Sequence, residues 1–199
     1  MTGDGLLIAV TGGSCSGKTT VVKRMRTAFS SYIHVIDEVA SAVLARDDLD
    51  QETMSDAKRR ALQLEIYARQ RDAERAVRRV PCTVTDRSTI DAASYWPEGV
   101  DDFWRQVGSG HDAEHARYHT VVWLESCAAI GLYERTLIRT ESAEVSLAHG
   151  QRLLTLWQGH PRLHLVKAQS SFEAKCSNVL AIVRAVLPPS VFNSDPAHG

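Results

Sequence analysis

The chain has 199 residues, of which 44% are hydrophobic and 24% charged, and this composition excludes an intrinsically disordered protein. Lysine plus arginine number 23 and aspartate plus glutamate 24, so the net charge of -1 lacks the basic excess typical of nucleic-acid-binding proteins. No apolar run approaches the roughly 18 residues of a membrane span, and the first residues do not resemble a signal peptide. We therefore expect a cytoplasmic protein without a membrane partner. The four cysteines are widely spaced and predict neither a disulfide framework nor a zinc site.

Short apolar runs alternate with longer helical patterns along the chain. One helical pattern follows the apolar run at 6–10 and another precedes the apolar run at 82–85, because apolar residues recur in both places at helical spacing. Strands that alternate with helices predict an α/β fold with a parallel sheet. The expected strands are 6–10, 32–36, 82–85, 120–124 and 163–166, and the two helical faces are Val21, Val22, Met25 and Phe29, and Leu62, Ile66, Ala73 and Val77.

The last expected helix has a start signal and a stop signal. Ser170 and Glu173 have the spacing of a capping box, in which Glu173 reaches back to the N–H of Ser170. Pro188 and Pro189 end the helix. We therefore predict one domain over residues 1–187 and a flexible tail over 188–199. The expected apolar face of this helix is Phe172, Cys176, Val179, Leu180, Val183 and Leu187.

The strongest motif is the sequence GGSCSGKT at residues 12–19, which fits the phosphate-binding pattern G-x-x-x-x-G-K-[ST] between an expected strand and an expected helix. Glycines let successive N–H groups turn toward phosphate oxygens, and the helix N-terminus adds partial positive charge. Lys18 is expected to contact the β and γ phosphates and Thr19 to ligate Mg²⁺, while Cys15 is interpreted as a small spacer. The predicted nucleotide-binding residues are Gly12, Gly13, Ser14, Cys15, Ser16, Gly17, Lys18, Thr19 and Thr20.

Acidic residues follow three of the expected strands, where open α/β sheets bind their ligands. Phosphoryl transfer needs a carboxylate for Mg²⁺ and often a second one for the acceptor. We predict that Asp86 holds the metal and that Arg87 stabilises charge on the transferring group. Glu38 is predicted on the acceptor side, with Asp37 as the alternative, and Glu125 is the least favoured of the acids. Each of these acids is also compatible with a solvated strand end or a helix cap.

Three further features have competing interpretations. Arg135 and Arg139 are four residues apart, so they would share one helical face and close over a triphosphate, or belong to a solvated helix. Residues 58–79 carry an excess of five positive charges, which is more typical of a solvated helix face than of a nucleic-acid site. The spacing of His111, His115 and His119 does not predict a metal site, and the four tryptophans are expected to pack in or around the core.

With these motifs in this order, the chain resembles P-loop kinases of the nucleoside and nucleotide kinase type. It is most similar to the P-loop domains labelled AAA that include the ribosylnicotinamide kinase domain of NAD-biosynthesis regulators. The resemblance implies a five-stranded parallel sheet in the order 2-3-1-4-5. It runs from about Leu6 to Leu187 and rests on GGSCSGKTT at 12–20, Asp37-Glu38, DRSTIDAASY at 86–95, the Arg135 and Arg139 segment, and SSFEAKCSNVLAIV at 170–183.

The same resemblance implies roles for individual residues. Glu38 would act as the acceptor base or orient the acceptor, and Arg87 would contact the acceptor or the γ phosphate. Gln70 would reach the acceptor, and residues 168–171 would border the nucleobase. Arg135 and Arg139 would form a lid.

Two positions depart from the pattern of these relatives. Ser41 stands where many of them have an arginine, and Ser88 stands where a glycine is usual. Both positions belong to the acceptor pocket, so the identity of the acceptor stays open.

The sequence as a whole predicts a Mg²⁺-dependent kinase that moves the γ-phosphoryl group of ATP or GTP to a small acceptor. The alternative is a nucleotide-dependent regulatory switch with slow hydrolysis, although the chain has no N-K-x-D motif. A nucleic acid is the least favoured partner, and a homodimer is left open as the assembly state.

Overall fold

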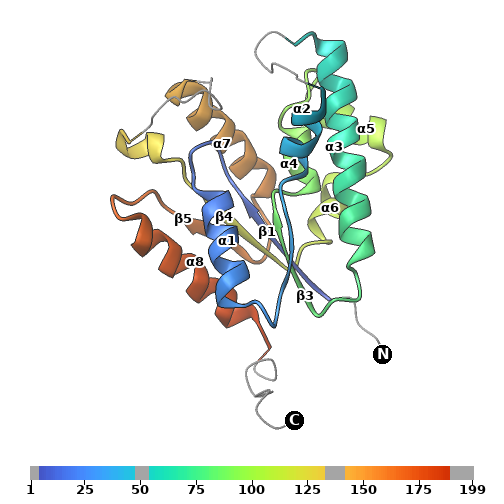
Figure 1. Cartoon of the computed structure of the whole chain (residues 1–199). Helices are drawn as coiled ribbons and strands as arrows, with labels where there is room; N and C mark the ends of the chain where they lie inside the picture. Colours follow the sequence, from blue (N-terminus) through green and yellow to red (C-terminus); the bar gives the residue numbers. More distant parts are fainter. Residues whose placement is uncertain (1–4, 48–53, 133–141, 189–199) are drawn as a thin grey trace.

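The fold is built on one parallel sheet (Figure 1). The computed structural model describes residues 5–47, 54–132 and 142–188. The strand order is β2-β3-β1-β4-β5, and every neighbouring pair is parallel, so the predicted α/β fold and its sheet order are confirmed. The strands are β1 (Leu6–Thr11), β2 (His34–Ile36), β3 (Cys82–Asp86), β4 (Thr120–Leu124) and β5 (Leu163–Val166).

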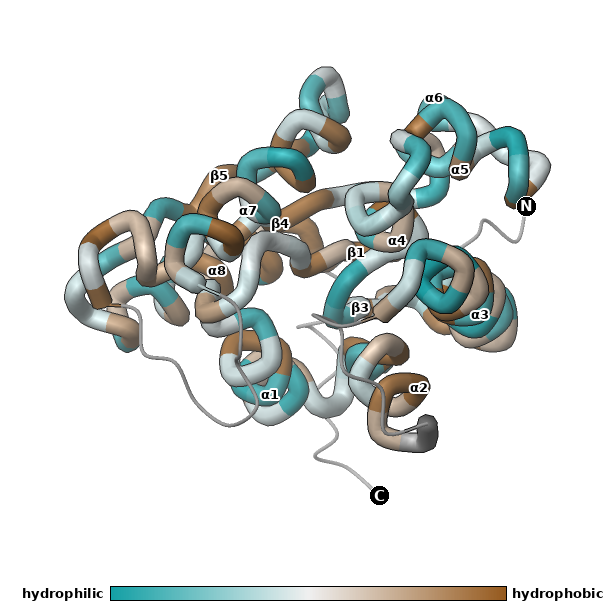
Figure 2. The backbone as a smooth tube through the Cα atoms, turned by 90° about the horizontal axis from the view of Figure 1, so that it is seen from above, coloured by the Kyte–Doolittle hydropathy of each residue, from teal (hydrophilic) through white to brown (hydrophobic). Residues whose placement is uncertain are grey.

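Helices cover both faces of the sheet, as the view from above in Figure 2 shows. On one face lie α1 (Lys18–Ala28) and α8 (Phe172–Val186), which contact each other. None of the helices in the described ranges has the length and apolar character that a bilayer span requires. The remaining elements are α2 (Val39–Asp47), α3 (Asp56–Ala76), α4 (Thr89–Ala93), α5 (Val100–Val107), α6 (His111–His115), the 3₁₀ helix η1 (Cys127–Ile130) and α7 (Ala143–Trp157).

The central strand β1 divides the core into two layers. Ile8 and Val10 pack on the side of α1 and α8, whereas Ala9 packs on the other side with Trp157, as the alternation of side chains along a strand requires. All three β1 residues are fully buried, which explains why this strand appears in the sequence as a continuous apolar run. The four tryptophans are buried, so the expectation of core packing is confirmed.

The buried face of α3 differs from the predicted one. Ala73 and Val77 are only half-buried, and Gln70 and Glu74 take the inner positions instead. These polar side chains are accommodated because they have buried partners, such as the Thr85 hydroxyl 2.6 Å from the Gln70 amide nitrogen. The apolar periodicity therefore located the helix but misplaced its inner face near the C-terminal end.

The predicted capping box of α8 is wrong by one residue. Ser171, rather than Ser170, precedes the helix, and its hydroxyl accepts a hydrogen bond from the N–H of Ala174 (3.2 Å). Glu173 forms an ion pair with Arg24 on α1 instead of reaching back to the cap (2.6 Å). The pairing of neighbouring helices thus replaces the local hydrogen bond that the sequence suggested.

The turn after β1 packs so closely on α7 that it tolerates no side chain at Gly13. A Cβ atom there would lie 2.6 Å from the Ser146 carbonyl oxygen and 3.2 Å from the Gly150 Cα, both of which are backbone atoms. We expect Gly13→Ala to lower the free energy of unfolding by about 1–3 kcal/mol, as measured by denaturant titration. Gly110→Ala is the matched control, because nothing lies within 4 Å of its Cβ position. Equal stability of the two variants would contradict this close contact.

Candidate functional site

The loop between β1 and α1 has the backbone of a tight anion-binding turn. Gly12 has φ 136°, Cys15 has φ 56° and Gly17 has φ 86°, all in the region that favours glycine. At Gly12 a Cβ atom would also lie 2.1 Å from the Leu124 carbonyl oxygen at the end of β4. Glycine is therefore required at position 12 both by the dihedral angle and by the neighbouring strand.

Three consecutive carbonyl groups of this loop, at residues 14–16, are hydrogen-bonded to elements outside it. A trans peptide places each C=O opposite the following N–H, so the N–H groups of residues 15–17 point away from those elements. Successive N–H groups left free on one side of a tight turn are the donors of a typical anion site. The donors are Ser146 Oγ on α7 to Ser14 O (2.9 Å), Cys127 N in η1 to Cys15 O (3.1 Å) and Lys175 Nζ on α8 to Ser16 O (2.8 Å).

The ammonium group of Lys18 lies against the same loop. Its Nζ donates to the carbonyl oxygens of Gly12 (2.9 Å) and Gly13 (2.8 Å), and it lies 3.2 Å from Ser16 Oγ. Burial lowers the pKa of Lys18 to about 8, and the positive charge of Arg87 acts in the same direction. An anion bound at the loop would favour the charged ammonium, so the side chain is suited to bind phosphate.

Asp86, at the end of β3, has the properties of a metal ligand. Its carboxyl group is buried, and its Oδ1 has no hydrogen-bond partner among the described residues. Burial raises the pKa of Asp86, whereas the Lys18 charge and a hydrogen bond with Thr19 lower it. An unsatisfied carboxylate oxygen beside a threonine hydroxyl fits Mg²⁺, which commonly takes one or two protein oxygens plus phosphate and water. Within the described ranges, no group of three or more histidine, cysteine, aspartate or glutamate side chains forms a protein-only metal site.

Glu38 and Arg87 form a pair next to this carboxyl edge of the sheet. Arg87 has φ 78° and its Nε donates to Glu38 Oε1, while Ser41 Oγ donates to Glu38 Oε2 (2.6 Å). Burial favours the protonated acid, but Arg87, Ser41 and Lys18 together lower the pKa of Glu38 to about 2. Asp37 instead forms an exposed ion pair with Arg26 (2.7 Å). Of the two acids that the sequence left open, Glu38 is therefore the one that the structure brings to Arg87.

Asp91 is a buried acid of this region that the residue-level analysis did not single out, although it lies in the DRSTIDAASY motif. It accepts hydrogen bonds from Thr11 Oγ1 (2.9 Å) and Ser88 Oγ (2.6 Å), and its Oδ2 lies 3.6 Å from Arg87 Nη1. Burial raises its pKa, which Arg87 and these hydroxyls oppose. Ser88 also caps α4, so this departure from the family pattern has a structural use.

His149 on α7 is a second residue that the sequence analysis missed. Its ring packs edge to face against the Tyr95 ring, and the two ring centroids are 3.7 Å apart. The Nε2 atom of His149 is buried and has no hydrogen-bond partner among the described residues. Burial and the Arg87 charge lower the pKa of His149 to about 4, so the ring is neutral at pH 7. No spacing in the sequence connects position 149 with Arg87, because their electrostatic interaction depends on how α7 packs.

The other candidate residues fall outside this cluster. Glu125 accepts from the N–H of Ala168 (2.9 Å) and pairs with Lys167 (3.3 Å), which ties two loops together. The Gln70 amide is buried and occupied by protein partners, so its implied contact with the acceptor is not favoured. Arg135 and Arg139 lie outside the described residues.

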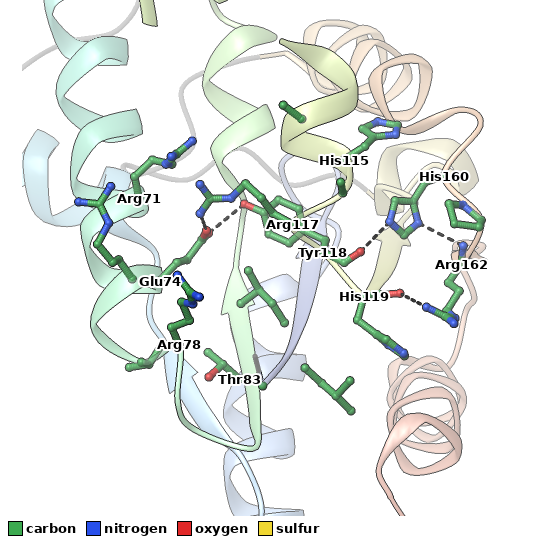
Figure 3. A pocket seen from close by; sticks show the side chains of 18 of the residues that line it. Arg71, Glu74, Arg78, Thr83, His115, Arg117, Tyr118, His119, His160 and Arg162 are labelled. Atoms are coloured by element: carbon green, nitrogen blue, oxygen red, sulfur yellow. Dashed lines mark hydrogen bonds and ion pairs between the residues drawn. The ribbon is translucent and has the colours of Figure 1, made fainter. Parts of the chain in front are cut away.

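A cavity of about 930 Å³ lies at the opposite, amino edge of the sheet (Figure 3). Part of the basic segment 58–79 lines it, but Glu74 pairs there with Arg117 and also accepts a hydrogen bond from Tyr118 (2.9 Å). His115 Nε2 lies 2.6 Å from the Leu156 carbonyl oxygen, so its ring has a structural partner. These contacts give Glu74 and His115 partners within the protein, and the cavity lining contains no residue of the phosphate loop.

Comparison with known proteins identifies the family of the chain. A family model described as AAA domain matches residues 7–175. The chain belongs to this AAA domain family. The predicted resemblance to the P-loop domains labelled AAA is thereby confirmed, and the solved structures described next share the fold. No curated protein sequence matches this AAA domain chain.

Solved structures share the fold of this AAA domain at low sequence identity. NadR protein in complex with NAD and AMP-PNP has a TM-score of 0.64 and 12% identity over 91% of this chain and 49% of its own. NadR protein in complex with NR has a TM-score of 0.64 and 13% identity over 91% of this chain and 50% of its own. Deoxyadenosine kinase from M.mycoides with bound dATP has a TM-score of 0.63 and 9% identity, covering 90% of this chain and 99% of that one. The chain thus spans about half the length of the NadR chains and nearly all of the deoxyadenosine kinase.

The low pKa of Glu38 predicts a pH dependence of stability. The pKa is about 2 in the folded protein against 4.5 for an ordinary glutamate, so the Glu38 carboxylate stabilises the fold above about pH 4.5. This stabilisation, on the order of 2–3 kcal/mol, is lost as the pH falls toward 2. We expect Glu38→Gln to lower the free energy of unfolding at pH 6 and to reduce its dependence on pH below 4.5, measured by urea titration. Asp37→Asn is the matched control, and an identical pH profile for both variants would contradict the ion pair.

Proposed function

We propose that this AAA domain is a Mg²⁺-dependent small-molecule kinase that transfers the γ-phosphoryl group of ATP or GTP to a nucleoside-like or other small acceptor. The observation that carries the proposal is the set of hydrogen bonds to the carbonyl groups of residues 14–16, which turns the following N–H groups away from α7, η1 and α8. Lys18 lies against the same loop and interacts electrostatically with Asp86 and Arg87, and phosphoryl transfer needs these charges.

On the donor side, the loop N–H groups and Lys18 would hold the phosphates. Thr19 and Asp86 would hold Mg²⁺, because the Oδ1 of Asp86 has no partner among the described residues. The metal would supply positive charge to the phosphate oxygens. Arg87 is half-buried and charged at neutral pH, so it would spread the negative charge that develops on the transferring group.

On the acceptor side, Glu38 would accept a hydrogen bond from the attacking hydroxyl group. Its pKa of about 2 makes it a weak base, so its main contribution is to orient the oxygen. Weak basicity suffices because in a loose transition state the proton leaves late. The acceptor oxygen forms a bond to the γ phosphorus, the bond to the β–γ bridging oxygen breaks, and the hydroxyl proton passes to Glu38.

We also propose the acceptor wall and the unit that carries the activity. Tyr95 and the neutral His149 ring pack edge to face near Arg87, and a ring-containing acceptor would pack against the half-buried Tyr95 ring. Residues 1–187 are proposed as the functional unit, with 188–199 as a tail, and the cytoplasm as the compartment. The assembly state, monomer or homodimer, is decided by the molecular mass in solution.

Loss of the Lys18 ammonium is the direct test of the donor site. We expect Lys18→Ala to weaken the binding of MgATP, MgGTP or both by at least about tenfold in calorimetry, because a buried positive charge at the phosphates is removed. Lys23→Ala is the matched control, since Lys23 is exposed on the same helix. Unchanged affinity of Lys18→Ala for both nucleotides would overturn the proposed site.

Removal of the Asp86 charge tests the catalytic proposal. Asp86→Asn keeps the side-chain volume, so we expect the fold to persist, by circular dichroism, while turnover falls about a hundredfold. Asp37→Asn should retain wild-type turnover because Asp37 pairs with an exposed arginine. Full activity of Asp86→Asn would remove Asp86 from the mechanism.

The same turnover assay separates the kinase from a regulatory switch. Nucleoside triphosphate consumption is measured with and without a panel of nucleosides, ribosides and mononucleotides. Acceptor-dependent release of the diphosphate, with a phosphorylated acceptor in the mass spectrum, supports the kinase. Slow turnover that no acceptor changes would favour the switch.

A further inference from the structure

Two of the four cysteines meet at the phosphate loop. Cys15 lies in the loop and Cys127 begins η1, and their Sγ atoms are 2.6 Å apart although the residues are 112 positions apart in the sequence. The backbone is joined at the same place, because the N–H of Cys127 donates to the Cys15 carbonyl oxygen (3.1 Å). Side chains and backbone thus make one contact that no cysteine spacing predicts.

These two cysteines also differ from the other two in their access to solvent. Cys15 and Cys127 are half-buried, whereas Cys82 and Cys176 are buried. Burial raises the pKa of the Cys82 thiol to about 11, which makes it unreactive at neutral pH. A reagent in solution would therefore meet the pair at the loop first.

The Lys175 ammonium group interacts electrostatically with both cysteines. Lys175 Nζ donates to Ser16 O (2.8 Å) and to Glu125 O (2.6 Å), which holds the ammonium between the loop and the end of β4. Burial lowers the pKa of Lys175, and its interactions with Cys127, Glu125 and Cys15 raise it. Cysteines next to a positive charge and open to solvent are the ones that take part in redox chemistry.

We infer that Cys15 and Cys127 are a redox modification site, at which an oxidant of the disulfide class closes them into a disulfide that ties the phosphate loop to η1. One cysteine thiolate attacks glutathione disulfide, which forms a mixed disulfide and releases one glutathione thiolate. The second cysteine thiolate attacks the bound cysteine sulfur and releases the second glutathione. The two cysteine thiols lose two electrons and two protons in total, and one glutathione disulfide becomes two thiols.

The disulfide preserves the phosphate loop in its binding form. Cys15 has φ 56°, an unfavourable angle for a residue with a side chain, and its carbonyl already accepts from η1. A disulfide between Cys15 and Cys127 holds the loop against η1, as the hydrogen bond to the Cys15 carbonyl oxygen already does. Oxidation therefore pre-organises the loop, and the expected affinity for MgATP is equal or higher. This last step rests on the proposed function, whereas the disulfide does not.

Mass spectrometry of the full chain tests the disulfide. The reduced protein is incubated with glutathione disulfide, unfolded and alkylated with iodoacetamide. We expect two alkylated cysteines (Cys82 and Cys176) and a peptide pair joined through Cys15 and Cys127, with four alkylated cysteines after dithiothreitol. Four alkylated cysteines without the reductant, persistent glutathione adducts on the pair, or a disulfide between two chains would each overturn the inference.

Single variants assign the bond. Cys15→Ser and Cys127→Ser are each expected to abolish the joined peptide and to leave at most a glutathione adduct on the remaining cysteine. Cys82→Ala is the matched control and should retain it. A joined peptide in either serine variant would overturn the assignment.

Stability and affinity test the pre-organisation. The oxidised wild-type protein should unfold at a temperature higher by about 5 °C or more, and should bind MgATP within about threefold of the reduced protein or more tightly. A loss of affinity of more than about threefold on oxidation would overturn the pre-organised loop. Absence of MgATP binding in both forms would remove the proposed function and the pre-organisation together, while the mass spectra still decide the disulfide.

Discussion

The whole site depends on one constraint: the carbonyl groups of the phosphate loop accept hydrogen bonds from α7, η1 and α8. Peptide groups that present their N–H donors to an anion on one side need partners on the other side for the carbonyl groups that face the protein interior. In this AAA domain the acceptors at residues 14–16 are bonded by α7, η1 and α8, which come from three separate parts of the chain. The loop is therefore shaped by the packing of the C-terminal half of the fold, and its own sequence is only one of the requirements.

The charges at the carboxyl edge of the sheet balance one another in the same region. Arg87 lies at the centre, with Glu38 and Asp91 as its anionic partners, and it lowers the pKa of both Lys18 and His149. Removal of this half-buried arginine would destabilise the fold, because the buried Asp91 and the half-buried Glu38 would lose their cationic partner. The arrangement supplies fixed charge before any ligand binds, which is the condition for electrostatic stabilisation of a transferring group.

The sequence predicted the sheet well because buried parallel strands appear as apolar runs and the loop motif has a strict spacing. It also identified Asp86, Arg87 and Glu38 as residues at strand ends, which a parallel sheet brings together by topology. It did not find His149 or the Cys15–Cys127 contact, because both depend on packing between segments more than 50 residues apart in the chain. The wrong α8 cap and the misplaced inner face of α3 have the same origin, since tertiary ion pairs and buried hydrogen bonds replaced the local preference.

Amide chemical shifts on titration with MgATP test the central claim most directly, since they report on each N–H group of the loop. The account predicts that the largest changes occur at residues 13–19, and that changes at the amino edge of the sheet, near Arg78 and Arg162, are small. Large changes confined to the amino edge, or none at residues 13–19 at saturating nucleotide, would contradict an anion site formed by these peptide groups.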